Sequence, residues 1–396
     1  MKLPAVKLKP QRPERLGHPW VYDNEIAAAP PGFANGGLVS VQDARGRTLG
    51  VGFANLRSTI AVRYLTRRFD EPVDAAFWQG RLRRAWEYRQ ARYAQLGPMP
   101  PAFRLAHGEA DGLPGLVVDI YPGFAVAQFL ALGLEPWRET IVQALSALPG
   151  VRGVYERSDS PVRRLEGLDE QTGALAGDTP PDVLEWEDAG ATVLADLKAG
   201  AKTGLFLDQR ENQAAAAREA SGRDVLNCFS YTGLFGLRAA RAGARSITDV
   251  EISTAFCALD KEQWARNGQD IPHSAVTDNV FDYLRSLDSK GYKTDMVILD
   301  PPAFTKSRAS RDGAMRGYNE VNRVGLRLLR PGGVLVTCSC SHHLSMGEFR
   351  DLVAQAARDA GRSLRLVAQR SQPADHPVLL SAPESEYLKC LILAAD

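Results

Sequence analysis

Residues 225–237 read VLNCFSYTGLFGL, and this stretch decides the fold of the second half of the 396-residue chain. It begins as a buried strand, turns at a glycine and continues as a helix. Strands and helices alternate in this way from about residue 185 onward, which is typical of a doubly wound α/β sheet with parallel strands. Such a sheet binds its ligand where the strands end. We expect strands at 225–229, 246–251, 274–278, 295–300, 333–340, 364–369 and 387–395.

Two smaller domains are expected before this one. Residues 1–67 are short apolar runs separated by turn residues, which indicates a small antiparallel β domain. Residues 68–184 open with a helix near 75–96 and continue through strand-like runs and a second helix, so we expect a small α+β domain. Its last part, DEQTGALAGDTPPD (169–182), is polar with Gly and Pro and is interpreted as a linker. The third domain is then 185–396.

The composition excludes several classes of protein. The chain is 44% hydrophobic but has no apolar run of about 18 residues, so a membrane-spanning helix is not expected. It begins without the apolar segment of a secretory signal. The cysteines are irregularly spaced, which suits reduced thiols better than disulfides. We therefore expect a cytoplasmic protein, with its five cysteines at Cys228, Cys257, Cys338, Cys340 and Cys390.

The net charge of +1 conceals an uneven distribution. Residues 1–94 hold sixteen Lys and Arg against eight Asp and Glu, a net of +8, so residues 95–396 carry −7. A basic first part favours a polyanionic partner. The alternative is a solvated arginine-rich helix, and the two interpretations have about equal weight.

The turn after the first strand of the third domain predicts the cofactor. Gly233 allows a ligand to approach the backbone before the helix begins. The pattern differs from the G-x-G-x-x-G of dinucleotide-binding folds, which favours a ligand without phosphate. S-adenosylmethionine is the common case. The contacts expected at this strand end are Asn227, Phe229, Ser230, Tyr231 and Gly233.

Acidic residues end the next two strands. Glu251 follows Gly233 by 18 positions, where a carboxylate can accept hydrogen bonds from both ribose hydroxyls. A helix N-cap is the alternative, although Ser253 fits that role better. Asp278 and Asn279 end the third strand, where they could take the adenine amino group or cap the next helix. Both roles stay open for this pair.

Asp300, Pro301 and Pro302 follow the fourth strand and predict part of a catalytic site. The two prolines stiffen the loop and remove backbone donors. A flat target base can then lie against this edge, with Asp300 near its ring nitrogen. A simple strand-ending turn is the alternative, but Asp-Pro-Pro at the fourth strand marks enzymes that methylate planar nitrogen-containing groups.

Cys340, at the end of the fifth strand, is the expected nucleophile. Carbon-5 of cytosine is too weakly nucleophilic to attack a methyl sulfonium, and a thiolate that adds to carbon-6 makes it an enamine, which can attack. Asp300 would act as the general acid toward the ring nitrogen. Cys338 lies on the same face but deeper, so we expect it in the core. The alternative for Cys340 is a small buried hydrophobic side chain.

Segments spread along the chain carry a family resemblance: HPWVYDNEI (18–26), GFANLRSTIAVR (52–63), EADGLPGLVVDIY (109–121), KTGLFLDQRENQ (202–213), VLNCFSYTGLFGL (225–237), DPPAF (300–304), RGYNEVN (316–322) and SCS (339–341). Together they resemble the bacterial ribosomal RNA cytosine-C5 methyltransferases that carry an N-terminal PUA domain. The resemblance covers nearly the whole chain, and its motifs are specific as a set.

This resemblance implies a PUA domain, a central α+β domain and a Rossmann-like methyltransferase domain that uses S-adenosylmethionine. It also implies that Cys340 is the nucleophile and Asp300 the acid, in a reaction on cytosine in large-subunit ribosomal RNA. A loop of Leu207, Asp208, Gln209 and Arg210 would close over the cofactor. The expected substrate contacts are Pro301, Pro302, Phe304, Lys306 and Tyr318.

One departure concerns product release. Many RNA cytosine methyltransferases have a second cysteine after the prolines, where this chain has Ala303, so the release step is left unexplained. Partners are expected to include ribosomal RNA but no membrane and no metal, because His342 and His343 have no further ligands beside them. A homodimer stays open.

Three other functions are considered. A ribosomal RNA methyltransferase acting on another atom, such as a guanine nitrogen, would not need Cys340. A pure RNA-binding module with an inactive methyltransferase fold would not need Asp300 either. An NAD-dependent dehydrogenase is disfavoured because the G-x-G-x-x-G pattern is missing.

Overall fold

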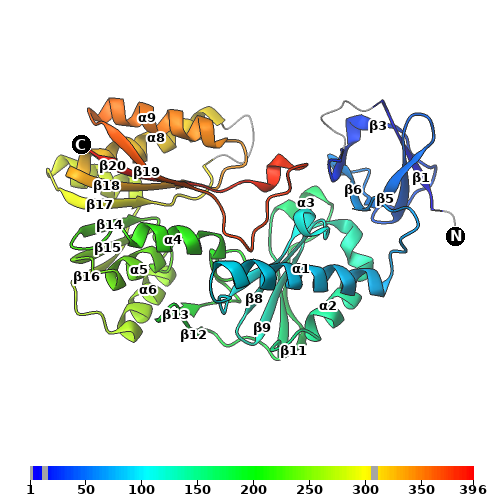
Figure 1. The fold of residues 1–396 in the computed structure, drawn as a ribbon, viewed down its shortest axis with the longest axis horizontal. Helices are drawn as coiled ribbons and strands as arrows, with labels where there is room; N and C mark the ends of the chain where they lie inside the picture. The colour runs from blue at the N-terminus through cyan, green and yellow to red at the C-terminus, as the bar shows by residue number, and fades with distance from the viewer. Residues whose placement is uncertain (1–2, 11–16, 305–310) are drawn as a thin grey trace. The chain divides into compact units, whose positions relative to one another are not determined.

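A computed structural model describes residues 3–10, 17–304 and 311–396 (Figure 1). The chain forms two compact units. Unit 1 consists of the described residues up to Ala189 together with 195–207 and 374–385. Unit 2 consists of 190–194, the described part of 208–373, and 386–396. The division into three domains at 1–67, 68–184 and 185–396 stays a prediction.

A six-stranded sheet forms the first part of unit 1, in the order β2-β6-β5-β4-β1-β3. Neighbouring strands are antiparallel except β1 and β4, which are parallel. Apolar residues alternate along these strands and pack into one small core. The strands are β1 (Ala5–Leu8), β2 (Trp20–Tyr22), β3 (Ile26–Ala28), β4 (Leu38–Gln42), β5 (Thr48–Ala54) and β6 (Ile60–Thr66).

A five-stranded sheet with helices α1 and α2 forms the second part of unit 1, in the order β11-β10-β9-β8-β7. Asp74 caps α1, because its carboxylate accepts a hydrogen bond of 3.0 Å from the Phe77 amide. The elements are α1 (Ala75–Leu96), β7 (Phe103–His107), β8 (Leu116–Tyr121), β9 (Phe124–Phe129), α2 (Arg138–Ser146), β10 (Gly153–Ser158), α3 (Val162–Leu165) and β11 (Gln171–Gly177).

The linker interpretation of residues 169–182 is wrong. Most of this stretch is β11, which pairs antiparallel with β10 from Ser158↔Gln171 to Gly153↔Gly177. β11 is an edge strand with one neighbour, and its side chains are exposed or half-buried. Because such a strand needs no apolar face, its composition does not distinguish it from a loop.

A seven-stranded sheet forms the centre of unit 2, in the order β16-β15-β14-β17-β18-β20-β19. The predicted strands are all present within a few residues of the expected positions. They are β14 (Asp224–Cys228), β15 (Ser246–Glu251), β16 (His273–Thr277), β17 (Thr294–Leu299), β18 (Leu329–Ser339), β19 (Leu364–Arg370) and β20 (Lys389–Ala395). A separate two-stranded sheet, β12 (Leu184–Asp188) with β13 (Ala191–Ala195), comes earlier in the chain.

The alternation of strands and helices predicted a sheet that is parallel throughout. This prediction is wrong for one strand. β14 to β18 are parallel, but β20 runs antiparallel to both β18 and β19. A parallel neighbour needs a crossover that returns the chain to the same edge, and helix α9 provides one before β19. No α-helix lies between β19 and β20, so the chain enters the gap between β18 and β19 from the opposite edge.

Helices cover both faces of this sheet (Figure 1). Residues of α7, α8 and α9 pack on one face in a core with Leu299, Leu335 and Leu391. Residues of α4 and α5 pack on the other face with Ile298, Val336 and Cys390. The helices are α4 (Arg210–Ala217), α5 (Leu234–Arg241), α6 (Thr254–Asn267), α7 (Val280–Ser289), α8 (Arg311–Leu328) and α9 (Met346–Ala360). Within the described ranges, no helix combines the length and apolarity required to cross a bilayer.

Candidate active site

The candidate site lies in unit 2, where parallel strands end side by side. Cys228, the last residue of β14, pairs with Val250 of β15 and with Leu299 of β17. Leu299 in turn pairs with Thr337 of β18. The segments that follow these strands therefore leave the same edge of the sheet, which is where a doubly wound sheet binds its ligand.

The segment after β14 has an unusual backbone. Phe229, Tyr231 and Gly233 all have positive φ, at 58°, 53° and 76°. A non-glycine residue in this region costs of order 1–3 kcal/mol, and such strain is concentrated at functional sites. The Ser230 amide donates to the Val250 carbonyl at 3.1 Å, which anchors the loop to the next strand. The loop is thus held in a fixed shape before α5 begins.

Glu251 holds this loop from the end of β15. One carboxylate oxygen accepts from the Tyr231 amide at 3.1 Å, and the other accepts from the Ser253 amide at 3.0 Å. The side chain is half-buried, and each oxygen keeps lone-pair capacity for a ribose hydroxyl. The helix cap is Ser253, as expected, whose hydroxyl accepts from the Phe256 amide. Glu251 is therefore free of the capping role that was the alternative.

Gly233, at the end of this loop, and Gly236, in the first turn of α5, face buried carboxylates. A Cβ on Gly233 would collide with the Asp260 carboxylate, and one on Gly236 would lie 2.6 Å from an oxygen of Asp249. Both Asp side chains are at most 2% exposed. These glycines are therefore required by the protein's own packing, a reason that sequence reasoning did not identify.

His273 lies between these two carboxylates. Its Nε2 is 3.0 Å from Asp249 and 3.6 Å from Asp260, and its ring stacks on Trp264 with centroids 3.9 Å apart. Burial alone lowers the pKa of His273, but hydrogen bonds and attraction from the two carboxylates outweigh it and raise this pKa to about 9. Burial and the nearby Asp260 raise the pKa of Asp249 to about 7. The imidazolium form thus offsets negative charge that has no access to water.

Asn227 belongs to this buried cluster. It is 1% exposed and donates to Asp249 at 2.6 Å, so the structure places it inside the sheet behind the loop. Asp278 and Asn279 are exposed at the end of β16, and Asn279 caps α7 by accepting from the Phe281 amide at 2.9 Å. The cap is the role that the geometry shows for Asn279, while adenine binding stays a prediction.

The edge of the sheet at which the parallel strands end is called the strand-end edge below. Residues 208–210 bond to two segments at this edge, the one before β20 and the one after β17. Asp208 accepts a 2.6 Å hydrogen bond from the Tyr387 hydroxyl. Gln209 donates to Asp300 at 2.7 Å and accepts from Asn212 at 2.7 Å. Arg210 begins α4. The segment that the family resemblance placed over the cofactor is thus bonded directly to the expected catalytic acid.

Aromatic rings surround the segment after Asp300. Phe304 lies 4.6 Å from Tyr318, 5.6 Å from Phe281 and 6.3 Å from Phe229, measured between ring centroids. Tyr318 is 1% exposed, so it is the buried member of this group of rings and packs against Phe304 from the protein interior. Pro301 is buried and Pro302 is exposed. Lys306, also expected to contact the substrate, falls outside the described residues.

The two cysteines at the end of β18 differ in burial. Cys338 is fully buried and packs with Cys390 in the core beside α4 and α5. Cys340 follows the last residue of the strand and is half-buried. It is the one cysteine of the five that is not buried, and it lies on the same edge of the sheet as Asp300.

Comparison with known proteins agrees with this geometry. Residues 6–67 match the family described as a PUA-like domain, and residues 168–393 match the family described as S-adenosylmethionine-dependent methyltransferase, which is more than half of the chain. The chain belongs to the S-adenosylmethionine-dependent methyltransferases.

Relatives named "Ribosomal RNA large subunit methyltransferase I" resemble this methyltransferase along nearly its whole length. The one from Aeromonas salmonicida is 40% identical over 96% of this chain and 95% of its own. The one from Alteromonas mediterranea is 41% identical over 98% of each chain. The solved structure of SMU.776 complexed with SAH superposes with a TM-score of 0.85 over both whole chains at 21% identity, which shows the shared fold.

Two site residues of the methyltransferase were missed from the sequence, Lys389 and Tyr387. Lys389 is 3% exposed in β20. Its Nζ donates to the carbonyls of Ser341 and Tyr387, each at 2.6 Å. Burial lowers the pKa of Lys389 to about 8. The signal was present, because a lysine interrupts the apolar run YLKCLILAA (387–395), and charged residues are rarely buried without a partner.

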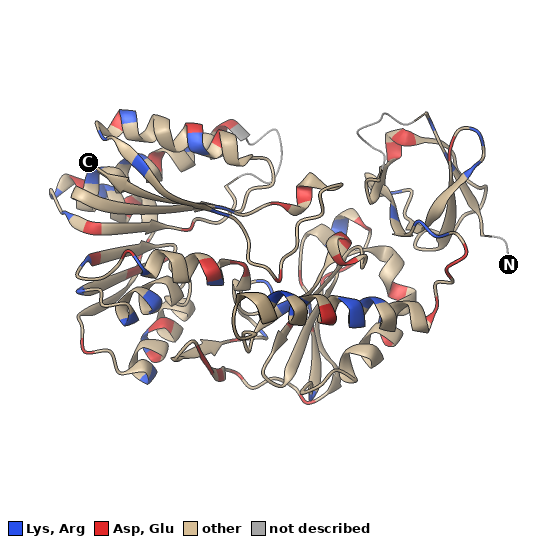
Figure 2. Ribbon diagram, viewed as in Figure 1, with Lys and Arg blue, Asp and Glu red and all other residues tan. Residues whose placement is uncertain are grey.

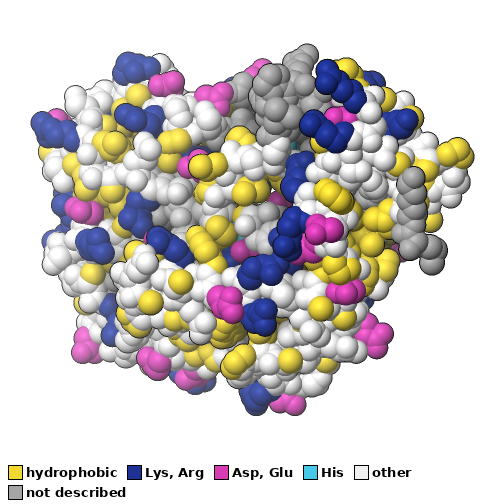
Figure 3. Space-filling model, turned by 45° about the vertical axis from the view of Figure 1, so that its right-hand side comes forward, with side chains coloured by type: hydrophobic (Ala, Val, Ile, Leu, Met, Phe, Trp, Pro, Cys, Tyr) yellow, Lys and Arg dark blue, Asp and Glu magenta, His cyan; other side chains and the backbone are white. Residues whose placement is uncertain are grey.

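The basic first part of the methyltransferase is less basic on its surface than its composition indicates. Arg63 pairs with Glu109 and Glu166, and Arg89 pairs with Asp111, all within unit 1. These arginines are buried, and their acidic partners lie beyond residue 94. Figure 2 shows charges of both signs along α1, and on the face drawn in Figure 3 basic and acidic side chains are interspersed. Counting charge by sequence window overstated the basic character of this region.

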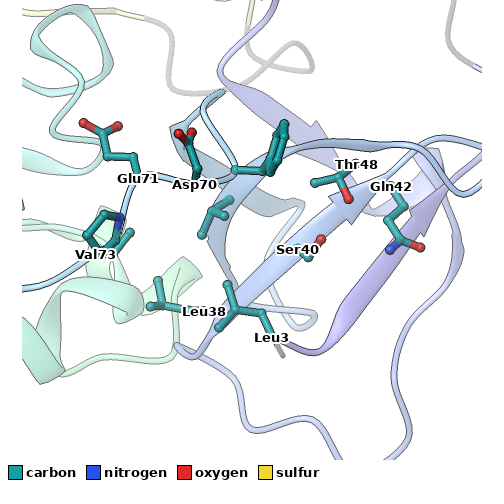
Figure 4. Close-up of a pocket in the computed structure, with 11 residues that line it drawn as sticks. Leu3, Leu38, Ser40, Gln42, Thr48, Asp70, Glu71 and Val73 are labelled. Atoms are coloured by element: carbon teal, nitrogen blue, oxygen red, sulfur yellow. The ribbon is translucent and has the colours of Figure 1, made fainter. Parts of the chain in front are cut away.

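A pocket of about 480 Å³ lies in unit 1, beside β4 and β5 (Figure 4). Its lining includes Leu38, Phe69 and Val73 together with the carboxylates of Asp70 and Glu71. None of its lining residues is Lys or Arg, so this lining does not attract phosphate groups. The pocket belongs to unit 1, whereas the strand ends described above belong to unit 2.

Proposed function

We propose that this enzyme transfers a methyl group from S-adenosylmethionine to carbon-5 of a cytosine in large-subunit ribosomal RNA, through a covalent bond between Cys340 and carbon-6. The observation that carries the proposal is the position of Cys340. It is a half-buried thiol on the same strand-end edge as Asp300, in a fold whose other four cysteines are buried. The name of the relatives supports ribosomal RNA as the substrate.

The residues at the end of β14 and β15 fit the cofactor. We assign cofactor contacts to the strained loop, to Glu251 and to residues on neighbouring segments, namely Asp208, Gln209, Arg210, Phe229, Ser230, Tyr231, Gly233, Glu251, Asp278, Asn279 and Asp300. Asn227, which was also expected to contact the cofactor, is buried behind the loop. Glu251 offers carboxylate lone pairs for ribose hydroxyls, and Asn227 acts from behind the loop. S-adenosylmethionine supplies the methyl group, carried on a positively charged sulfur.

The chain's own task is to make cytosine carbon-5 nucleophilic. The Cys340 thiolate adds to carbon-6 while the ring nitrogen takes a proton from Asp300, which gives an enamine. After methylation, a base takes the carbon-5 proton, the thiolate leaves carbon-6, and the ring nitrogen returns its proton to Asp300, which together restore the aromatic ring. Gln209, which donates to Asp300, orients this carboxyl group. Pro302, Phe304 and Lys306 are the proposed contacts to the base and its neighbours, and Pro301 and Tyr318, which are buried, would support these contacts from within the protein.

RNA binding is proposed for residues 1–67. A target base must leave its stack to reach Cys340, so a separate domain that holds the RNA is useful. Binding through Lys and Arg should weaken with salt because counterions are released. The compensated charges of Arg63 and Arg89 predict a smaller salt dependence than a net charge of +8 would indicate.

The test is the identity of the product. Large-subunit ribosomal RNA from cells lacking the protein should lose one 5-methylcytosine, which wild-type protein restores and Cys340→Ala does not. RNA containing 5-fluorocytosine should form a stable adduct with wild-type protein, because fluorine cannot leave as a proton does. A methylated guanine nitrogen, or full activity of Cys340→Ala, would contradict the proposal.

A further inference from the structure

Lys389 is a buried cation beside the strand end that carries Cys340. It pairs across the antiparallel β18–β20 ladder with Ser339, the residue before Cys340. Both oxygens that accept from its Nζ are backbone carbonyls, and one belongs to Ser341, the residue after Cys340. Burial of an ammonium group is costly, so its retention here calls for a function.

The bonds around Cys340 fix the backbone on both of its sides. The Ser341 amide donates to the Ser339 hydroxyl at 3.3 Å, and that hydroxyl donates to Tyr318 at 3.0 Å. The Ser341 carbonyl accepts from Lys389. The amide and carbonyl of Ser341 are therefore both held by side chains. Removal of the Lys389 ammonium would release one of these two attachments.

The charges near this point favour an anion at Cys340. The groups that act electrostatically on Lys389 are Cys340, Glu386 and Glu348, with Cys340 the strongest of the three. Tyr318 is near both Cys340 and Asp300, and burial raises the pKa of its hydroxyl to about 12, so it stays neutral. Lys389 and Tyr318 both interact electrostatically with Cys340, and Lys389 carries a positive charge.

We propose that Lys389 is a positioning residue for Cys340, which holds the Ser341 carbonyl with its ammonium group and stabilises the thiolate form of the neighbouring cysteine. On ionisation the Cys340 proton passes to solvent, and the negative charge left on the sulfur is attracted by the nearby ammonium group. The need for a thiolate rests on the proposed function, but the ionisation itself requires neither RNA nor cofactor.

The test is the rate at which Cys340 is alkylated by iodoacetamide as a function of pH in the full-length protein. Mass spectrometry of the Cys340 peptide separates it from the four buried cysteines. We expect the wild-type midpoint to lie below that of an ordinary thiol. In Lys389→Met we expect it to rise by about one pH unit, so alkylation at pH 7 slows about tenfold.

Two variants separate charge from structure. Lys389→Arg keeps the positive charge and should restore most of the alkylation rate. Lys293→Met is the matched control, because Lys293 also donates its Nζ to a backbone carbonyl, that of Arg327, but it precedes β17 at the opposite end of the strands. It should leave the Cys340 profile unchanged. Thermal unfolding and S-adenosylmethionine binding verify that each variant is folded.

The outcomes distinguish this inference from the proposed function. An ordinary midpoint in wild-type protein, or equal midpoints in wild type and Lys389→Met, would overturn the role of Lys389 even if 5-methylcytosine is formed. A low midpoint that rises in Lys389→Met supports it, even if the methylated atom proves to be another one. Equal shifts in the Met and Arg variants would show that packing rather than charge is responsible, and would also overturn it.

Discussion

The two halves of the strand-end edge in unit 2 are supported by buried groups of opposite charge. Behind the loop after β14, two carboxylates, Asp249 and Asp260, share one imidazole, that of His273. Behind the end of β18, the ammonium group of Lys389 is bound by carbonyls. Each half is also fixed by hydrogen bonds to its backbone, from Glu251 in the first and from Ser339 in the second.

This difference matches what each half is proposed to bind. The first half faces a cofactor with a positive sulfur, and the second holds a thiol that must become negative. Charges buried away from water act strongly and need no reorganisation during the reaction. The comparison therefore predicts that substitutions in the first half change cofactor binding and stability, whereas substitutions in the second half change turnover.

The largest effect is expected from Cys340→Ala. Without a nucleophile the carbon-5 atom is not activated, so single-turnover methyl transfer should fall at least about 1,000-fold, or ~4 kcal/mol. The dissociation constant for S-adenosylmethionine, measured by calorimetry, should change less than about twofold. A large loss of cofactor affinity in this variant would break the separation between the two halves.

The next effect is expected from His273→Ala. This change leaves two buried carboxylates without their cation and should lower the free energy of unfolding by about 3 kcal/mol, measured in urea. Cofactor affinity should fall as well, because Asp260 lies against Gly233 and Asp249 lies against Gly236. His343→Ala, at an exposed histidine, is the control and should stay within about 0.5 kcal/mol of wild type.

A smaller effect is expected from Gly233→Ala. Its left-handed backbone and the collision with Asp260 should together cost about 2 kcal/mol of stability. Gly222 has a similar φ of +71° but open space around it, so Gly222→Ala should cost only about 1 kcal/mol. Equal losses in the two variants, in matched urea titrations, would show that the carboxylate contact is unimportant.

The smallest effect concerns pH. The pKa of His273 is raised to about 9 in the folded protein, so its contribution is fully present below its unfolded value of about 6.5 and is lost as the pH rises through 9. The stability difference between wild type and His273→Gln should therefore shrink as the pH rises from 6.5 to 9.5. A difference that is constant or grows would mean that the histidine is not charged.

Much of the fold was predictable from particular residues. The change from strand to helix at 225–237 predicted the third domain, and the expected strands are present there. Cys338 in the core, the position of Cys340 at the end of its strand and the Ser253 cap were also predicted correctly. These features depend on local periodicity and on residue chemistry at strand ends, both of which are visible in a single sequence.

The errors have physical causes. β11 was mistaken for a linker because an edge strand needs no apolar face. The reversed β20 was missed because strand direction depends on how the chain returns to the sheet, not on the strand's own residues. Arg63 and Arg89 were counted as surface charge because their partners lie far along the chain.

By itself the sequence determined the alternation of elements and the family of S-adenosylmethionine-dependent methyltransferases, and it predicted the residues proposed for methyl transfer, because strand ends and reactive side chains follow from local pattern. Tertiary structure alone decided which charges support them. His273, Asp249 and Asp260 come from three separate elements, and Lys389 reaches the carbonyl of Ser341, the residue after Cys340, from the neighbouring antiparallel strand. Burial turns these distant residues into strong partners, and burial is a property of the folded chain rather than of any segment.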